Sequence, residues 1–238
     1  MSSTLFISDL HLDASRPELS RALAAFLQRH ADCHALYILG DLFEAWIGDD
    51  DDAEPAPETC RLLRRFSDGG PSLYLMHGNR DFLLGEEFAR QAGATLIPDP
   101  TVIDLYGEPT LLMHGDSLCT SDTHYQAFRQ QARDCRWQSE ILAHSLDERR
   151  ALATRLHHLS KEQNSNKAED IMDVTSAEVT RVMAAQGVRQ LIHGHTHRPM
   201  RHEEAHGLRW VLGDWGQKGW AIEASEGEIN LYNFDIYQ

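Results

Sequence analysis

Five short apolar runs along the chain each stop at a polar residue of a type that can bind a metal ion. The runs are Leu5-Phe-Ile7, Leu36-Tyr-Ile-Leu39, Leu73-Tyr-Leu-Met76, Leu111-Leu-Met113 and Leu191-Ile192. Continuous apolar runs are typical of strands that are buried on both faces of a parallel sheet. Because ligands of such sheets bind beyond the strand ends, the polar residues after the runs are the candidate site.

These polar residues are aspartate, asparagine and histidine. They are Asp9, His11, Asp41, Asn79, His114, His195 and His197. His195 and His197 alternate in an extended segment, so both imidazoles can reach one small volume. A lone His-x-His pair is more often a solvated loop than a metal site. Five strands that deliver such residues to one edge are hard to explain as core packing, so the whole set predicts a metal site.

The wider pattern predicts an α/β fold. Helices are expected at 17–30, 57–67, 82–92 and 175–186, between strands near 4–8, 35–39, 72–76, 102–106, 109–113 and 190–193. Alternating helices and strands indicate a mainly parallel sheet. Strands with alternating polarity at 208–212, 219–222 and 229–235 indicate antiparallel pairing. We therefore expect an α/β sandwich of two mixed sheets flanked by helices.

Residues 123–165 interrupt this alternation, because their apolar residues recur at helical spacing and no strand-like run occurs. The block lies between two strands that carry candidate ligands, so it must begin and end near the site. We interpret residues 122–168 as a helical cap inserted into one domain that spans residues 1–238. The alternative is an extra pair of packing helices.

Composition describes an ordinary soluble globular protein, with 42% hydrophobic and 25% charged residues. No apolar stretch is long enough to span a membrane and no signal peptide is evident, so we expect a cytoplasmic protein. The four cysteines form no CxxC pattern and are expected to be reduced. The sequence leaves the oligomeric state open, and a monomer is our expectation.

The net charge of −15 argues against a nucleic-acid binder. Residues 122–167 are the exception, with eight Lys and Arg against six Asp and Glu. An anionic substrate is therefore expected at this segment. The acidic run Asp49–Asp52 has the wrong spacing for a calcium loop, and we interpret it as a solvated loop rather than a second metal site.

The mixture of imidazole, carboxylate and amide ligands suits Mn²⁺, Fe²⁺, Zn²⁺ or Co²⁺. Seven ligands exceed one tetrahedral site, and two metal ions about 3.5–4 Å apart that share a carboxylate would use them all. Such a pair indicates hydrolysis of a phosphate ester or anhydride.

The ordered blocks Asp9-x-His11, Gly40-Asp41, Gly78-Asn79, His114 and Gly194-His195-Thr-His197 resemble the signature of the calcineurin-like metallophosphoesterases. The resemblance implies that one metal is held by Asp9, His11, Asp41 and His197. It implies that Asp41 also bridges to a second metal, held with Asn79, His114 and His195. The residues expected to act in catalysis are Asp41, Asn79, Arg80, His114 and His195.

Arg80 departs from the commoner family pattern, in which histidine follows the asparagine. Arginine stays protonated, so it cannot act as a general acid, but it can bind phosphate. A phosphate leaving group needs no proton, whereas an alkoxide benefits strongly from one. Arg80 therefore points to a pyrophosphate substrate.

Three longer stretches, 77–82, 114–129 and 194–199, resemble the branch of this family that hydrolyses UDP-2,3-diacylglucosamine in bacterial lipid A synthesis. The implied products are UMP and 2,3-diacylglucosamine 1-phosphate, after water attacks the α-phosphorus. The implied cofactors are two Mn²⁺ ions, and the implied location is the cytoplasmic face of the inner membrane, as a peripheral protein. The implied substrate contacts are Asn79, Arg80, Asp122, Ser160, Asn164, Lys167 and His195.

The sequence leaves the roles of several residues in the cap and near Asp41 open. Ser160, Asn164 and Lys167 share a helix face that either binds substrate or is a solvated helix end. Leu152, Leu156, Ile141 and Phe128 either line an acyl groove or pack the cap onto the body. Exposed Phe43 and Trp46 are candidates for membrane contact.

Three other functions compete with this interpretation. A dinucleoside polyphosphate hydrolase would use the same metal centre. A protein phosphatase is disfavoured, because those related enzymes carry Gly-Asp-x-Val-Asp-Arg-Gly where this chain has Gly40-Asp-Leu-Phe-Glu-Ala-Trp46. A non-catalytic scaffold of the same fold would be expected to lose ligands, and none is missing.

Overall fold

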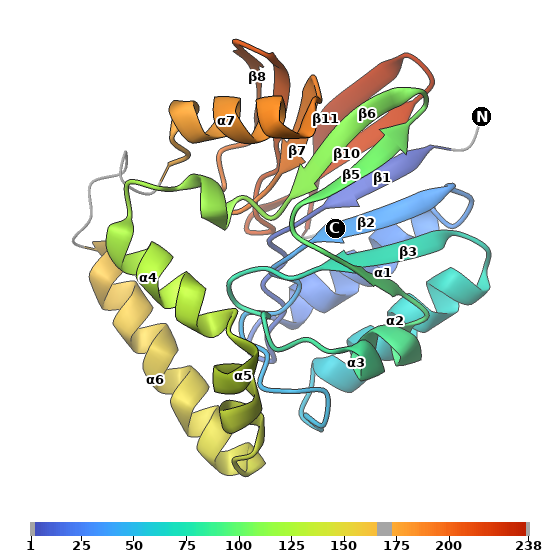
Figure 1. The fold of residues 1–238 in the computed structure, drawn as a ribbon. Coiled ribbons are helices and arrows are strands. Elements are labelled where there is room, and N and C mark those ends of the chain that lie inside the picture. Colours follow the sequence, from blue (N-terminus) through green and yellow to red (C-terminus); the bar gives the residue numbers. More distant parts are fainter. Residues whose placement is uncertain (1–2, 166–172, 237–238) are drawn as a thin grey trace.

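Two sheets lie face to face between layers of helices (Figure 1). The computed structural model describes residues 3–165 and 173–236, with only the backbone of 157–165. The first sheet has the order β11-β10-β1-β2-β3-β4 and the second β5-β6-β7-β9-β8. The predicted α/β sandwich of two mixed sheets is confirmed.

The first sheet combines four parallel strands with an antiparallel pair at one edge. Its strands are β1 (Thr4–Ile7), β2 (Ala35–Leu39), β3 (Ser72–Met76), β4 (Thr95–Ile97), β10 (Lys218–Ser225) and β11 (Glu228–Asp235). In the second sheet β6, β7 and β9 are parallel, and β5 and β8 run antiparallel to their neighbours. Its strands are β5 (Thr101–Leu105), β6 (Glu108–Met113), β7 (Gln190–His193), β8 (Met200–Glu204) and β9 (Gly207–Val211).

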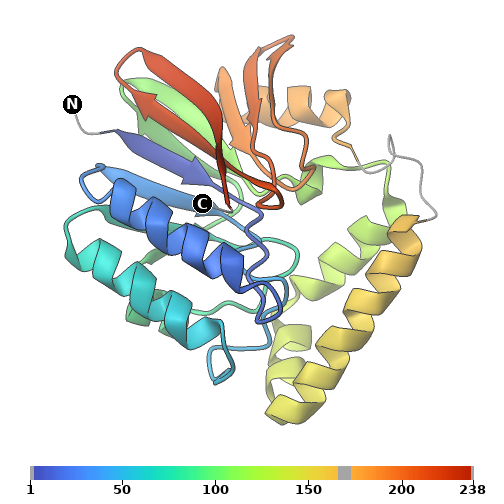
Figure 2. The same cartoon turned by 180° about the vertical axis from the view of Figure 1, so that it is seen from behind.

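Side-chain alternation along β1 explains the layers. Leu5 and Ile7 pack against the helices on the outer face, and Phe6 packs against the second sheet. All three side chains are fully buried, which is why this strand reads as one continuous apolar run. Figure 2 shows α1 (Pro17–Arg29) and α2 (Ala56–Asp68) across that outer face, while α7 (Ser176–Gln186) covers the second sheet.

The short helix α3 (Glu86–Ala92) begins four residues later than the predicted start at residue 82. The carboxylate of Asp49 accepts hydrogen bonds from the backbone N–H groups of Gly85 (2.8 Å) and Phe88 (2.9 Å). This distant side chain supplies the helix start, so no local capping residue is present for the sequence to reveal.

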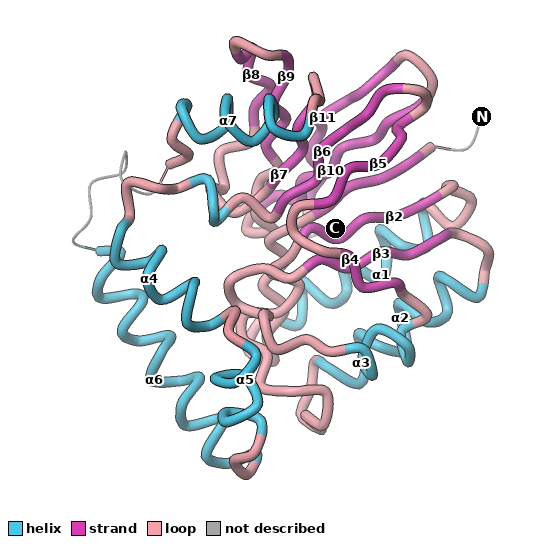
Figure 3. The backbone as a smooth tube through the Cα atoms, in the orientation of Figure 1, coloured by secondary structure: helices cyan, strands magenta, loops and turns pink. Residues whose placement is uncertain are grey.

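The predicted helical block consists of α4 (Thr123–Ala132), α5 (Cys135–Leu142) and α6 (Leu146–Ser165). We call these three helices the cap. Figures 1 and 3 show the cap beside the sheets, at the ends of β1, β2 and β3 where the chain leaves the strands. In the described part of the chain, no helix is long and apolar enough to cross a membrane.

Candidate metal centre

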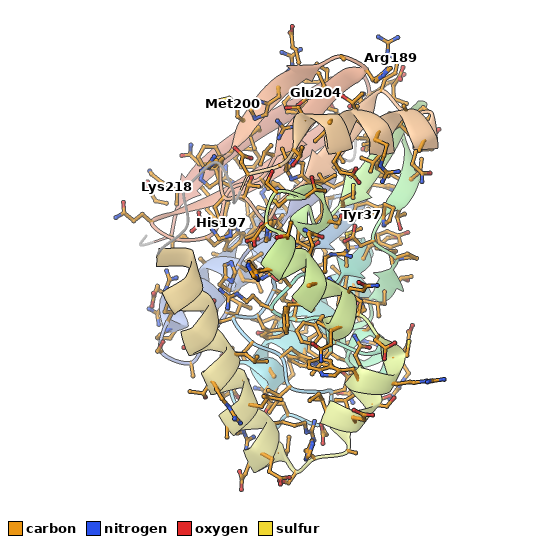
Figure 4. All side chains as sticks on the ribbon, turned by 60° about the vertical axis from the view of Figure 1, so that its left-hand side comes forward. Tyr37, Arg189, His197, Met200, Glu204 and Lys218 are labelled. Carbon is orange, nitrogen blue, oxygen red and sulfur yellow. The ribbon has the colours of Figure 1, made fainter. Side chains whose placement is uncertain are left out.

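The loops that follow five strands bring all seven predicted ligands to one side of the sandwich. Asp9 and His11 follow β1, Asp41 follows β2, Asn79 follows β3, and His114 follows β6. The loop after β7 supplies His195 and His197, and Figure 4 places His197 on the side that faces the cap.

Five of these residues have a left-handed backbone conformation. The φ angles are 55° for Asp9, 49° for His11, 51° for Asp41, 67° for His195 and 56° for His197. Positive φ is uncommon outside glycine and costs free energy, so it persists where surrounding structure enforces it. Residues with such a backbone conformation cluster at functional sites. No pattern in the sequence predicted these φ angles.

A first group of ligand atoms is formed by Asp9, His11 and His197. Nε2 of His197 lies 3.3 Å from Oδ1 of Asp9 and 3.3 Å from Nε2 of His11. Asp9 is fully buried, and no aligned hydrogen bond from the described residues reaches its Oδ1 atom. A buried carboxylate oxygen without a donor, beside two imidazole nitrogens, suits a bound cation.

A second group surrounds His114. Its Nε2 atom lies 2.9 Å from Oδ1 of Asn79, and Nδ1 of His195 lies 2.8 Å from the same oxygen. Nδ1 of His114 donates to the carbonyl of Leu39 at 2.9 Å, which turns Nε2 toward the site.

Asp41 lies between the two groups. Its Oδ2 atom is 3.9 Å from Nε2 of His11, and its Oδ1 atom is 3.8 Å from Nε2 of His114. Asp9 also approaches both groups, because its ligand atoms cluster with those of Asp41 and His114 as well. The donor set therefore fits two cations with a carboxylate shared between them.

Asp81 organises these loops and was missed as a site residue. Its Oδ1 atom accepts from the N–H groups of Gly78 (2.7 Å) and Asp41 (3.3 Å), and Oδ2 accepts from Leu42 (2.8 Å). The side chain is buried at 1% exposure. One carboxylate thus ties the β2 loop to the β3 loop. The only signal in the sequence is its place two residues after Asn79.

The electrostatics of the chain favour positive charge here. Burial raises the pKa of Asp41 to about 6, against the lowering effect of His114 and His11. Burial lowers the pKa of His114, but the carboxylates of Asp41 and Asp9 outweigh it and raise that pKa to about 9. Buried carboxylates that draw positive charge to themselves match the needs of a divalent cation.

The metal centre opens into a cavity of about 560 Å³ that extends beneath the cap. Predicted contacts Asn79, Arg80, Asp122 and His195 line it. Asp122 is buried and also caps α4 by accepting from the N–H of Tyr125. Lys167 and the side chains of Ser160 and Asn164 lie outside the described residues.

The far wall of the cavity is apolar. Phe82, Phe128, Trp137, Ile141, Leu152 and Leu156 all line it. Within α4 and α5 only Ala132 is buried, and the Phe128, Trp137 and Ile141 side chains that line the cavity are partly exposed. This arrangement favours a groove over simple packing of the cap.

The expectation that Phe43 and Trp46 are exposed is wrong. They are 2% and 4% exposed, and their rings pack at a tilt, with a centroid distance of 4.6 Å, inside the core beneath α3. Trp46 reaches only the cavity wall. The loop that carries these residues folds back onto the first sheet, where burying two aromatic rings is strongly favourable.

Asp50 and Asp52 of the acidic run are exposed to solvent, as expected for a solvated loop, and the run also joins the cap to the body, which the sequence did not predict. Arg149 of α6 donates to Asp50 and, at 2.6 Å, to the carbonyl of Ile47. Arg150 contacts Asp51 (3.0 Å) and Asp52 (2.6 Å). These adjacent carboxylates act together because the two arginines of α6 lie directly opposite them.

The other end of the cap is tied to the metal centre through α4. Arg129 donates to Oδ2 of the buried Asp116 at 2.9 Å, and the Tyr125 hydroxyl donates to the same oxygen. The Tyr125 ring stacks on the imidazole of His195, with centroids 5.9 Å apart. Arg133 donates to the carbonyl of Gly78 at 2.9 Å, next to Asn79.

The fold and the ligand set define a metal-dependent phosphoesterase, and comparison with known families agrees. Residues 2–199 match the model of the calcineurin-like phosphoesterases. The chain belongs to this family.

Individual relatives are more specific. The chain is 55% identical over 240 residues to a UDP-2,3-diacylglucosamine hydrolase of Cellvibrio japonicus (strain Ueda107), covering 98% of this chain and all of that protein. It is 54% identical over 229 residues to the UDP-2,3-diacylglucosamine hydrolase of Pseudomonas aeruginosa (strain UCBPP-PA14), with 93% and 94% coverage. A solved hypothetical protein of Pyrococcus horikoshii OT3 shares the fold, with a TM-score of 0.53 at 10% identity, over 99% of this chain and 88% of that one.

Proposed function

We propose that this chain hydrolyses the pyrophosphate bond of UDP-2,3-diacylglucosamine to UMP and 2,3-diacylglucosamine 1-phosphate, a step of lipid A biosynthesis. One observation carries the proposal: a single cavity joins the metal-binding residues to an apolar wall of the cap. A substrate with a diphosphate and acyl chains needs both surfaces within one molecule's reach. The names of the full-length relatives support the same substrate.

The seven ligands hold two divalent cations in this proposal, and we propose Mn²⁺ because the oxygen and nitrogen donors suit it. One cation is assigned to Asp9, His11, Asp41 and His197, and the other to Asp41, Asn79, His114 and His195. When bound, the cations supply activation of water and neutralise charge on the phosphoryl oxygens.

Arg80 binds the diphosphate in this scheme. It lines the cavity, and its own backbone N–H donates to Oδ1 of Asp41 at 2.8 Å, which fixes it beside the metal centre. A guanidinium stays charged and pairs well with phosphate oxygens. Attack at the α-phosphorus expels a sugar phosphate, a leaving group that requires no proton from the protein.

The remaining substrate contacts follow from the cavity lining and the family pattern. We assign diphosphate and sugar binding to Asn79, Arg80, Asp122 and His195, which line the cavity, together with Ser160, Asn164 and Lys167. We assign the acyl chains to the apolar wall, and residues 122–168 to a substrate-binding cap within one domain spanning 1–238.

A lipid-linked substrate implies contact with a membrane. We therefore propose that the chain acts as a monomer bound peripherally to the cytoplasmic face of the inner membrane. The bound acyl chains would provide the attachment.

The test is turnover of UDP-2,3-diacylglucosamine in ¹⁸O-labelled water by protein stripped with a chelator and restored with Mn²⁺. We expect label in UMP and no turnover before Mn²⁺ is restored. Label in the sugar phosphate would place the attack at the β-phosphorus instead. Turnover of a dinucleoside polyphosphate, with none of the glycolipid, would overturn the substrate while keeping the metal centre.

A further inference from the structure

Glu44 lies between the metal centre and the diphosphate-binding arginine, although it belongs to neither set. The backbone places it there, because residues 41–44 run beside residues 11 and 12. His11 N donates to Asp41 O (3.0 Å), Leu12 N to Leu42 O (3.0 Å), and Glu44 N to Leu12 O (3.1 Å). These bonds hold the Glu44 side chain next to His11.

The carboxylate of Glu44 reaches in two directions. Oε2 lies 3.0 Å from Nδ1 of His11. Oε1 lies 3.8 Å from a terminal nitrogen of Arg80. The Glu44 side chain is 26% exposed, and the His11 and Arg80 side chains are 13% and 24% exposed. Solvent therefore screens these charges only in part.

The side of the His11 ring opposite Glu44 faces the metal centre. Its Nε2 atom lies near His197 and Asp41, whereas its Nδ1 atom points to Glu44. A carboxylate on the outer nitrogen of a ligand histidine fixes the ring orientation and makes the inner nitrogen a better donor to a metal. The backbone of Arg80 is tied to the same loop, because Trp46 N donates to its carbonyl at 3.1 Å.

We propose that Glu44 is a positioning residue that couples the metal centre to the diphosphate clamp, holding the His11 imidazole with one oxygen and the Arg80 guanidinium with the other. The proposal rests on the function proposed above, since it uses that metal centre and that role of Arg80. Glu44 would then set metal affinity and substrate affinity through separate contacts.

Two substitutions separate these contacts. Glu44→Ala removes both, and we expect Mn²⁺ affinity to fall by about 10- to 100-fold, as is typical for loss of such an outer-shell partner. Glu44→Gln keeps an oxygen that can face His11 but loses the charge opposite Arg80. We expect this variant to retain most of the Mn²⁺ affinity and to show a raised KM when Mn²⁺ is saturating.

Mn²⁺ affinity is measured without substrate, from the electron paramagnetic resonance signal of free Mn²⁺ during titration of the metal-stripped protein. The matched control is Glu87→Ala, which removes another acidic group, one whose ion pair with Arg90 on α3 is solvent-exposed. It should leave both Mn²⁺ affinity and KM unchanged. Glu44→Gln has nearly the shape of the native side chain, so comparing it with Glu44→Ala guards against mistaking a folding defect for loss of the contact.

The substrate half of the proposal is tested by combining Glu44→Gln with Arg80→Ala. If Glu44 acts on KM through Arg80, adding Glu44→Gln to Arg80→Ala changes KM no further. Wild-type Mn²⁺ affinity in Glu44→Ala, or equal loss in Glu87→Ala, would overturn the proposal. If the chain binds Mn²⁺ but does not turn over the glycolipid, the proposed substrate fails, and the titration alone still decides the role of Glu44 at His11.

Discussion

At the scale of single residues, Asp81 holds two of the ligand-bearing loops together although it is not itself a predicted ligand. Its two oxygens accept three backbone hydrogen bonds from the β2 and β3 loops in a buried position. In Asp81→Asn the new amide would direct a donor at backbone N–H groups that are themselves donors. We expect a loss of about 1–3 kcal/mol in the free energy of unfolding, because buried donors lose their partner.

Denaturant unfolding measures that loss, and activity should fall with it because the loops carry Asp41 and Asn79. Asp104→Asn is the matched control, since Asp104 accepts from Gly107 in an exposed turn. The control should change stability by no more than about 0.5 kcal/mol. An equal effect in the two variants would mean that Asp81 does not organise the loops.

The seven ligands could be predicted from the sequence because each lies within a few residues of the end of an apolar run. Asp81 and Glu44 could not, because their contacts depend on how separate loops fold against one another. The positive φ angles of Asp9 and His195 could not be predicted from the sequence either. They are enforced by tertiary hydrogen bonds, such as the one from His195 N to Oδ2 of Asp9, and not by local sequence.

At the scale of secondary-structure elements, arginines tie the cap to the body through α4 and through the start of α6. Arg149 is the most buried of the connecting side chains, with 4% exposure, and it lines the cavity. In Arg149→Ala the Ile47 carbonyl loses this donor and Asp50 loses its ion pair, while Arg150 still pairs with Asp51 and Asp52. We expect the apolar wall to lose its alignment, raising KM for the diacyl substrate about tenfold, or about 1.4 kcal/mol.

Steady-state kinetics on two substrates tests this. A small soluble phosphodiester, bis(4-nitrophenyl) phosphate, needs the metal centre but not the apolar wall, so its hydrolysis should stay unchanged in Arg149→Ala. Arg181→Ala on α7 is the control, because Arg181 is exposed, pairs with Glu178 of the same helix and does not line the cavity. A parallel loss on both substrates would show that Arg149 supports the metal centre and not the cap.

Most elements could be predicted because periodicity is strong where a strand or helix is buried on a defined face, as in β1, β2 and α1. The strands β4 and β8 were missed. β4 has three residues, none of them fully buried, and β8 reads Met-Arg-His-Glu-Glu with no apolar alternation. Both are edge strands, held by pairing with β3 and β9 and not by burial of their side chains.

At the scale of the whole molecule, part of the negative charge lies buried at the metal centre. The chain carries a net charge of −15, and the buried part of that excess includes Asp9 and Asp41 at the metal centre. Burial lowers the pKa of His11, but the carboxylates of Glu44, Asp41 and Asp9 outweigh it and raise that pKa to about 9. A divalent cation would relieve the repulsion between the buried carboxylates of Asp9 and Asp41. Because only the folded chain brings the ligands together, the cation would bind the folded state.

Metal removal should therefore lower the stability of the entire protein. At a free Mn²⁺ concentration 100 times Kd, each of the two cations adds about 2.7 kcal/mol by binding to the folded state alone. For a domain of this size, two bound cations correspond to a Tm increase of about 10–20 °C over chelated protein. Differential scanning calorimetry with and without Mn²⁺ measures the shift, and Asp41→Asn is the control, because it removes the shared carboxylate. A Tm shift of equal size in Asp41→Asn would mean that Mn²⁺ stabilises the chain at a site other than the metal centre.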